Sequence, residues 1–276
     1  MHKLYVAMDE SDDALRGVTL GRQLAAQLGA EPVVTSVVKT PAQAEARRAV
    51  LHRMLAAQAD DDLALEVAVH DSVEAYLAEL ACRDDSALCM SARGRRPMSE
   101  VLLGSVAAGV VRRASRPVLL CGPRFDARRH SRVATLMVCV DGCRLSEAVL
   151  PHAVTLARQL GARLQLLNVV GTDATAVATA AGERHAEAME YGYVRGLARR
   201  LRDEPGMAVE WEVLHGEPGD AIVRYLADSR DALVAMTSHG RSGLSQVIAG
   251  SVAQQVLHAA PCPVALLRPA AEAGDG

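Results

Sequence analysis

The chain contains the same pattern twice, and this duplication limits what it can fold into. The segment "MSARGRRPMSEVLLGSVAAGVVRRASRPVLL" from Met90 matches "MTSHGRSGLSQVIAGSVAQQVLHAAPCPVAL" from Met236, with a shift of 146 residues. Nearer the start of each copy, "LYVAMDE" matches "LMVCVDG" with a shift of 132 residues. A unit of this length is a whole domain, because solenoid repeats recur at much shorter periods. The sequence therefore predicts two domains of one fold, at residues 1–124 and 132–276.

The two shifts differ, at 146 and 132 residues, so the second copy contains fourteen more residues than the first. We expect an additional helical stretch between its second and third strands, within Thr172 to Glu210. The charged segment "GPRFDARRHSR", Gly122 to Arg132, has no periodic apolar face and is predicted to join the two domains.

Each copy alternates short apolar runs with helical patterns. In the second copy, "TLMVCV" precedes a stretch in which Leu145, Val149 and Leu156 recur at helical spacing. Gly161 is predicted to end this helix, and Pro151 to kink it. The order β-α-β-α-β-α-β-α-β indicates the α/β class. We expect two doubly wound parallel-sheet domains, flavodoxin- or Rossmann-like, in tandem.

Composition excludes several classes of protein. Half of the residues are apolar and the formal net charge is −3, so the bulk charge favours neither nucleic acid nor an anionic membrane as a partner. The six cysteines form no CxxC motif and lack a histidine spacing suited to zinc, so we interpret them as reduced core or loop residues. No run of eighteen uncharged apolar residues and no signal-type start occurs, which predicts a cytoplasmic protein.

Two loops of the second copy carry features of a binding site. Asp141 follows the first strand, and the segment "TSHGRSG" from Thr237 follows the fourth. If strands 1 and 4 are neighbours, as in the order 2-1-3-4-5 or a relative of it, these loops share one crevice at the carboxyl ends of the strands. Gly240 would let the backbone approach a ligand closely.

The start of the last helix has two interpretations. Gly250 and Ser251 open this helix, whose unpaired N–H groups and dipole favour a phosphate. Alternatively, Ser251 and Gln254 form a capping box and Ser251 caps its own helix without binding anything. The spacing matches neither a Walker A loop nor a Rossmann GxGxxG motif.

The Asp after strand 1, the block "MTSHGRSGLSQVIAGSVAQQVLHAAPCPVALL" and the tandem repeat resemble the universal stress protein family in its two-domain form. The resemblance covers essentially the whole chain. It implies ATP binding through a G-x2-G-x9-G-S/T pattern, an Asp after strand 1 and a Val at the end of strand 2. It also implies that the fifth strands of the two domains pair edge to edge, giving an intramolecular pseudo-dimer. The implied nucleotide-binding residues are Asp141, Val169, Met236, Thr237, His239, Gly240, Gly250, Ser251 and Val252 in the second copy and Asp9, Val37, Arg93, Gly94, Gly104 and Ser105 in the first.

Both copies depart from this family pattern. Thr237 and Ser91 stand at its first glycine, and Pro97 stands where the second copy has Gly243. Arg93 replaces a histidine and begins an arginine cluster that could hold phosphates. The second copy matches the pattern more closely than the first.

The resemblance implies a regulatory protein of the stress response that binds ATP, with or without magnesium, and changes its conformation or partner accordingly. The alternative is a tandem domain that no longer binds ATP and serves as a protein-interaction module. A third alternative is slow ATP hydrolysis, although no catalytic residue and no metal site is assigned. The expected partners are an adenine nucleotide, an unidentified protein and a second copy of the chain in a homodimer.

Overall fold

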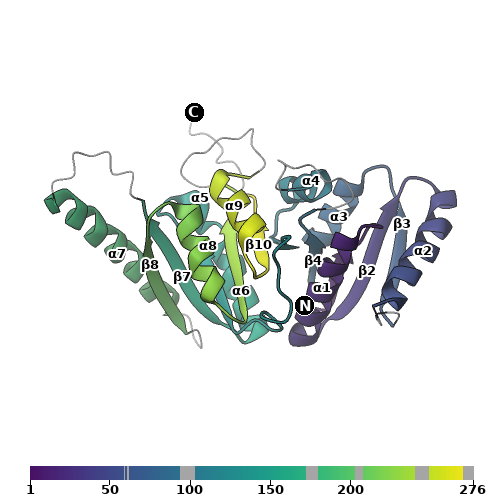
Figure 1. Cartoon of the computed structure of the whole chain (residues 1–276), viewed down its shortest axis with the longest axis horizontal. Helices are drawn as coiled ribbons and strands as arrows, with labels where there is room; N and C mark the ends of the chain where they lie inside the picture. Colours follow the sequence, from purple (N-terminus) through teal and green to yellow (C-terminus); the bar gives the residue numbers. More distant parts are fainter. Residues whose placement is uncertain are drawn as a thin grey trace.

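Two halves of the same architecture lie side by side (Figure 1). The computed structural model describes residues 1–58, 60, 62–93, 103–171, 180–202, 208–239 and 249–269. The first half consists of β1 (Lys3–Ala7), α1 (Asp12–Leu28), β2 (Glu31–Val38), α2 (Pro41–Ala56), β3 (Ala64–Val69), α3 (Val73–Cys82), β4 (Ser86–Ser91), α4 (Ser105–Arg113) and β5 (Val118–Cys121).

The second half repeats this alternation, as the sequence predicted, with two differences. Its elements are β6 (Thr135–Cys139), α5 (Arg144–Glu147), α6 (Leu150–Leu160), β7 (Arg163–Val170), α7 (Ala180–Arg202), β8 (Val209–His215), α8 (Pro218–Asp228), β9 (Ala232–Thr237), α9 (Ser251–Ala259) and β10 (Val264–Leu267). The first difference is that Pro151 lies in the first turn of α6, so the expected single helix is divided into α5 and α6. The second is that α7 has 23 residues whereas α2 has 16, which supplies part of the predicted extra length.

The strands form one ten-stranded sheet in the order β3-β2-β1-β4-β5-β10-β9-β6-β7-β8. Strands 1 and 4 of each half are neighbours, as expected, and the order within each half is 3-2-1-4-5, a relative of 2-1-3-4-5 rather than that order itself. The third strand of each half forms the outer edge of the sheet, and the burial along β3 is correspondingly incomplete. All pairings within a half are parallel.

The two halves are joined through their fifth strands. β5 and β10 pair in antiparallel orientation, with the register Leu120–Val264, Leu119–Ala265 and Val118–Leu266. This pairing confirms the intramolecular pseudo-dimer. It also covers two strand edges that would otherwise be exposed at the centre of the molecule.

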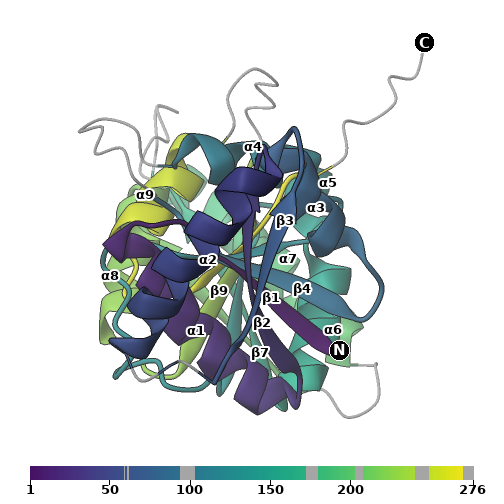
Figure 2. The same cartoon turned by 90° about the vertical axis from the view of Figure 1, so that its right-hand side faces the viewer.

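Helices cover both faces of the sheet (Figures 1 and 2). One buried cluster contains side chains of α1, α2, α6 and α7, and the other contains side chains of α3, α4, α8 and α9. The central strands between the two layers are therefore apolar on both faces, which explains the continuous apolar runs in the sequence. Gly29 and Gly161 end α1 and α6 in the left-handed conformation, with φ of 62° at each, and this confirms the predicted stop at Gly161.

The segment between the halves is bonded to both of them. The Asp126 N–H donates to the Pro261 carbonyl at 2.8 Å, next to β10. From α1, the Gln23 amide donates to the Ala127 carbonyl of the linker at 2.9 Å. These bonds fix the linker against the first half and the second half alike.

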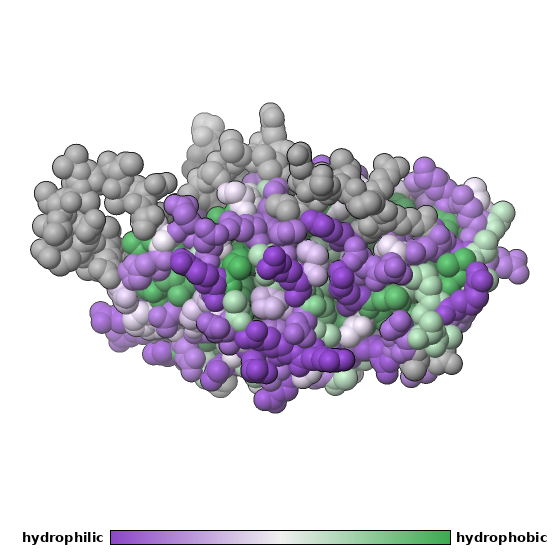
Figure 3. Space-filling view, viewed as in Figure 1, coloured by the Kyte–Doolittle hydropathy of each residue, from purple (hydrophilic) through white to green (hydrophobic). Residues whose placement is uncertain are grey.

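The visible surface is mostly hydrophilic, with apolar patches scattered between polar groups (Figure 3). Of the helices that the structure describes, none combines the length and apolarity needed to cross a membrane.

Candidate functional site

The strand order reverses between β1 and β4 in the first half and between β6 and β9 in the second. In each half these two strands are paired directly, so the loops that follow them meet at one edge of the sheet. Open α/β sheets bind ligands at this type of switch point. The topology therefore brings Asp9 close to the end of β4, and Asp141 close to the end of β9.

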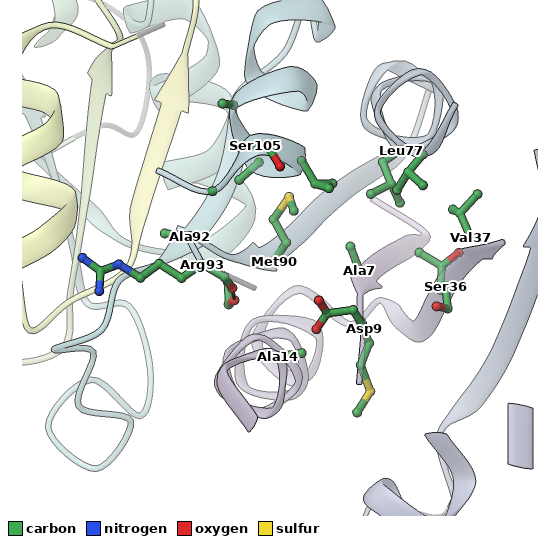
Figure 4. A pocket seen from close by; sticks show the side chains of 18 of the residues that line it. Ala7, Asp9, Ala14, Ser36, Val37, Leu77, Met90, Ala92, Arg93 and Ser105 are labelled. Atoms are coloured by element: carbon green, nitrogen blue, oxygen red, sulfur yellow. Dashed lines mark hydrogen bonds between the residues drawn. The ribbon is translucent and has the colours of Figure 1, made fainter. Parts of the chain in front are cut away.

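A cavity of about 740 Å³ opens at the switch point of the first half. It is bordered by five of the six residues that the sequence assigned there: Asp9, Val37, Arg93, Gly104 and Ser105 (Figure 4). The sixth, Gly94, lies outside the described residues, as do Arg95, Arg96 and Pro97. The cavity runs from the start of α4 to the end of β2 and the adjoining face of α3.

Asp9 is held in place by Ser11. The Ser11 N–H donates to Asp9 Oδ1 at 3.0 Å, and the Ser11 hydroxyl bonds the same oxygen. The Ser11 side chain also accepts from the Ala14 N–H and so caps α1. Figure 4 shows the Asp9 carboxylate between Ala7 and Ala14, within the cavity. A carboxylate fixed in this way can accept hydrogen bonds from a ligand without losing side-chain entropy.

The second half builds the same arrangement around Asp141. The Cys143 N–H donates to Asp141 Oδ1 at 3.0 Å, and Cys143 stands where the first half has Ser11. The Asp141 N–H in turn donates to the Ser146 hydroxyl at 3.1 Å. Val169 is half-buried near the end of β7, so both residues lie at the carboxyl edge of the sheet.

Glycine precedes both helices that begin at the switch points. Gly104 and Gly250 are the N-caps of α4 and α9, and their N–H groups donate to the carbonyls of Ala92 and Ser238, at 2.8 and 2.6 Å. Their φ angles of −61° and −64° are open to any residue. The glycines are therefore not required by the backbone conformation.

The capping-box interpretation of Ser251 is wrong. Ser251 is the first residue of α9 rather than its cap, and the Gln254 amide donates to the Ala249 carbonyl at 2.8 Å. Ser251 is exposed, and Val252 is half-buried behind it. Ser105 has the equivalent position at the start of α4, where it borders the cavity.

Hydroxyl side chains close the turns after β4 and β9, at the positions where the family pattern has glycine. Thr237 Oγ1 donates to the His239 carbonyl at 2.8 Å, and Ser91 Oγ makes the same bond to the Arg93 carbonyl. Met236, Thr237 and His239 are all buried. Gly240 lies outside the described residues, as does Gly243.

The side chain of Arg93 differs from the expectation of a phosphate ligand. Its Nη2 lies 3.2 Å from Nδ1 of His258, on α9 of the other half. Figure 4 shows the guanidinium directed away from Asp9 and Ser105. Arg93 therefore borders the cavity while its charged end contacts the second half.

Sequence reasoning missed three polar residues that border the cavity: Thr35, Ser36 and Arg47. Arg47, from α2, donates to the Ser36 hydroxyl at 3.0 Å and forms an ion pair with Glu10 at 2.8 Å. The only available signal was that Thr35 and Ser36 directly precede Val37 on the same strand. No motif pointed to Arg47, because the fold alone brings α2 over the end of β2.

The buried cysteines Cys121 and Cys262 do not supply a nucleophile. All six are free, and burial raises the pKa of the Cys121 and Cys262 thiols to about 12. These thiols stay protonated at neutral pH and are unreactive. Among the residues described, no three His, Cys, Asp or Glu side chains gather in a way that could hold a metal ion.

The fold and the site define a tandem pair of doubly wound α/β domains, joined by their fifth strands, with a cavity of about 740 Å³ at the switch point of the first. The model of the universal stress protein family matches residues 1–122 and again residues 133–268. The chain therefore belongs to the universal stress protein family and contains two of its domains.

Individual proteins support this assignment. Universal stress protein Rv2005c of Mycobacterium tuberculosis is 31% identical over 188 residues, which are 65% of this chain and 60% of that protein. Universal stress protein MJ0531 of Methanocaldococcus jannaschii is 26% identical over 137 residues, 48% of this chain and 81% of that protein. The match therefore spans about three fifths of the mycobacterial relative.

Solved structures show the same fold over nearly the whole chain. A universal stress protein from Archaeoglobus fulgidus superimposes with a TM-score of 0.66 at 19% identity, covering 96% of this chain and 98% of that one. The Pseudomonas aeruginosa protein PA1789, described as functionally unknown, gives a TM-score of 0.60 at 20% identity, covering 98% and 93%. At these identities the likeness concerns the fold alone.

Proposed function

We propose that this chain is an adenine-nucleotide-binding regulatory protein, in which ATP occupancy biases conformation or the choice of a protein partner. One observation carries the proposal. Asp9, Val37, Gly104 and Ser105, which are far apart in the sequence, border a single cavity of about 740 Å³. This volume is in the range of small-molecule sites.

The two ends of the cavity suit different parts of a nucleotide. The start of α4 offers unpaired backbone N–H groups and the positive end of the helix dipole, which favour phosphates. Gly104 has no side chain, so a phosphate can approach the backbone closely there. Apolar side chains at the end of β2 and on α3 suit the faces of a planar base.

The described residues outline a cavity in the first half, whereas the sequence pattern matches the family more closely in the second. In the second half, Asp141 is held by the same type of backbone bond as Asp9, and Gly250 and Ser251 begin α9 as Gly104 and Ser105 begin α4. We propose a nucleotide site there as well.

Calorimetric titration tests this function. The protein is stripped of nucleotide and titrated with ATP and magnesium at up to millimolar concentrations. Gly104→Trp should abolish binding in the first half while the fold survives, because a φ of −61° accepts a side chain. Gly250→Trp should act likewise on the second half. Asp9→Ala should weaken binding about fivefold, the effect of one lost hydrogen bond.

Gly192→Trp is the matched control, since Gly192 is exposed on α7 and has nothing near its Cβ position. It should leave the titration unchanged. If the unmutated protein gives neither heat nor a thermal shift with ATP, nucleotide binding is excluded. The protein-interaction module then becomes the better function.

A further inference from the structure

Arg93 carries a positive charge that no carboxylate balances among the described residues. Its side chain is partly buried, and the hydrogen bond that its guanidinium makes there is the one to Nδ1 of His258. A guanidinium can only donate, so Nδ1 is the acceptor and the imidazole is a neutral partner. Nε of Arg93 is buried and has no partner within the described part of the chain. A partly buried cation in this state favours an anion within its reach.

The cavity of the first half is the place where an anion can meet this side chain. Arg93 borders the cavity, and its backbone is bonded to the start of α4. The Gly104 N–H donates at 2.8 Å to the Ala92 carbonyl, which belongs to the peptide bond between Ala92 and Arg93. In Figure 4, Arg93 begins beside Ala92, and its guanidinium is directed away from Ser105. A change of side-chain rotamer can therefore direct the guanidinium to a phosphate at the start of α4.

His258 has a fixed position at the junction of the two halves. It lies in the last turn of α9, and the carbonyl of the preceding Leu257 lies against Gly122 of the first half. Just beyond the helix, the Pro261 carbonyl accepts from the Asp126 N–H at 2.8 Å. The end of α9 is therefore fastened to the segment that follows β5. Of the two partners, Arg93 is the one that can move.

The second half does not repeat this arrangement. The shift of 146 residues makes His239 the counterpart of Arg93, and Arg112 the counterpart of His258. Nδ1 of His239 lies 2.9 Å from the hydroxyl of its neighbour Ser238. An arginine at this position therefore occurs in the first half alone, and its contact with the second half has no counterpart of the same kind.

We propose that His258 withholds Arg93 from the ligand of the first half, and that a phosphate in the cavity displaces the guanidinium from His258. The inference rests on the proposed nucleotide binding and names how the second half regulates the first-half site. A phosphate replaces a neutral acceptor with a charged one, and a charge-assisted hydrogen bond is roughly twice as strong. Binding of a phosphorylated ligand then includes the cost of breaking the contact with His258. A ligand without phosphate does not compete for Arg93.

The test compares ATP with adenosine in calorimetric titrations of the full chain. The protein is stripped of nucleotide and carries Gly250→Trp, so that only the first half is titrated. His258→Ala should tighten ATP binding about fivefold, because one hydrogen bond no longer has to be broken. Arg93→Ala should weaken ATP binding about tenfold or more, because it removes a charged donor. Neither substitution should change the affinity for adenosine.

Three further variants connect these effects to one contact. In the Arg93→Ala protein, adding His258→Ala should change nothing more, because no guanidinium remains to be released. His258→Gln retains an acceptor for the guanidinium and should keep the affinity for ATP at its original value. The control His52→Ala removes an exposed histidine on α2 and should leave both affinities unchanged.

The failures of the two proposals are distinguishable. If Gly104→Trp abolishes ATP binding but His258→Ala does not tighten it, the site exists and the contact does not regulate it. Equal changes for ATP and adenosine would mean that His258 acts on the shape of the cavity, which overturns the role of Arg93 too. Undiminished ATP binding by Arg93→Ala overturns that role even if His258→Ala does not fold. If ATP does not bind the unmutated protein, the proposed function itself fails.

Discussion

Gly122 directly follows β5, and the backbone of α9 lies against it. A Cβ built on Gly122 would stand 1.9 Å from the Leu257 carbonyl oxygen, which belongs to the other half. Because the obstacle is backbone, a side chain there cannot be accommodated by a rotamer change. Gly122→Ala should lower the free energy of unfolding by about 1–3 kcal/mol or more, as overpacking does. Urea denaturation measures this directly.

Gly192→Ala is the matched control for this substitution. Gly192 lies within α7, and no atom lies within 4 Å of its Cβ position. Alanine should therefore raise the stability by about 0.5–1 kcal/mol, through helix propensity alone. Equal effects of the two substitutions would mean that the halves do not approach as closely at Gly122 as described.

The sequence predicted the roles of single residues less well than it predicted the helices and strands. Ser251 and Gln254 satisfy the capping-box spacing, but Gly250 is the N-cap of the helix. The local pattern therefore placed the N-cap one residue too late in the sequence. Arg93 follows β4 as expected, yet its guanidinium contacts His258 in the other half. Thr35 carried no motif at all. Each of these roles depends on contacts between segments distant in the chain, which local spacing does not specify.

Elements were predicted better than residues, because burial on both sides of a parallel sheet leaves continuous apolar runs in the sequence. The pairing of β5 with β10 was expected from the family resemblance. The outer position of β3 was not expected. Its alternating exposure, including exposed Val69, marks it as an edge strand only once the structure is known.

Amide hydrogen exchange should separate the central strands from the edge strands. Residues 118–121 and 264–267 lie at the centre of the ten-stranded sheet, whereas 64–69 and 209–215 form its two edges. Central amides should exchange only through global unfolding, and edge amides through smaller local openings. Exchange in β5 and β10 as fast as in β3 would contradict a sheet that is continuous between the halves.

For the whole molecule, the linker fixes how the halves are held together. His130 lies within it and is almost fully buried, and its Nδ1 accepts a hydrogen bond from the Ala232 N–H at 3.1 Å. This bond requires an unprotonated Nδ1. Burial lowers the pKa of His130 from its ordinary value of 6.5; Arg129 lowers it further, whereas Asp231 and Asp126 oppose the shift.

This shift makes the stability of the whole molecule dependent on pH. The unfolded chain binds a proton at His130 below about pH 6.5, whereas the folded protein resists protonation until a lower pH. The contribution of His130 is therefore complete above pH 6.5 and is lost as the pH falls through the lower folded-state pKa. Urea unfolding between pH 7.5 and 5 should show this decline. His130→Asn should flatten it, because the asparagine carbonyl can still accept from Ala232 but does not titrate. The control His2→Asn removes an exposed histidine and should keep the decline. Parallel profiles for the unmutated protein and His130→Asn would show that the linker does not sense acid.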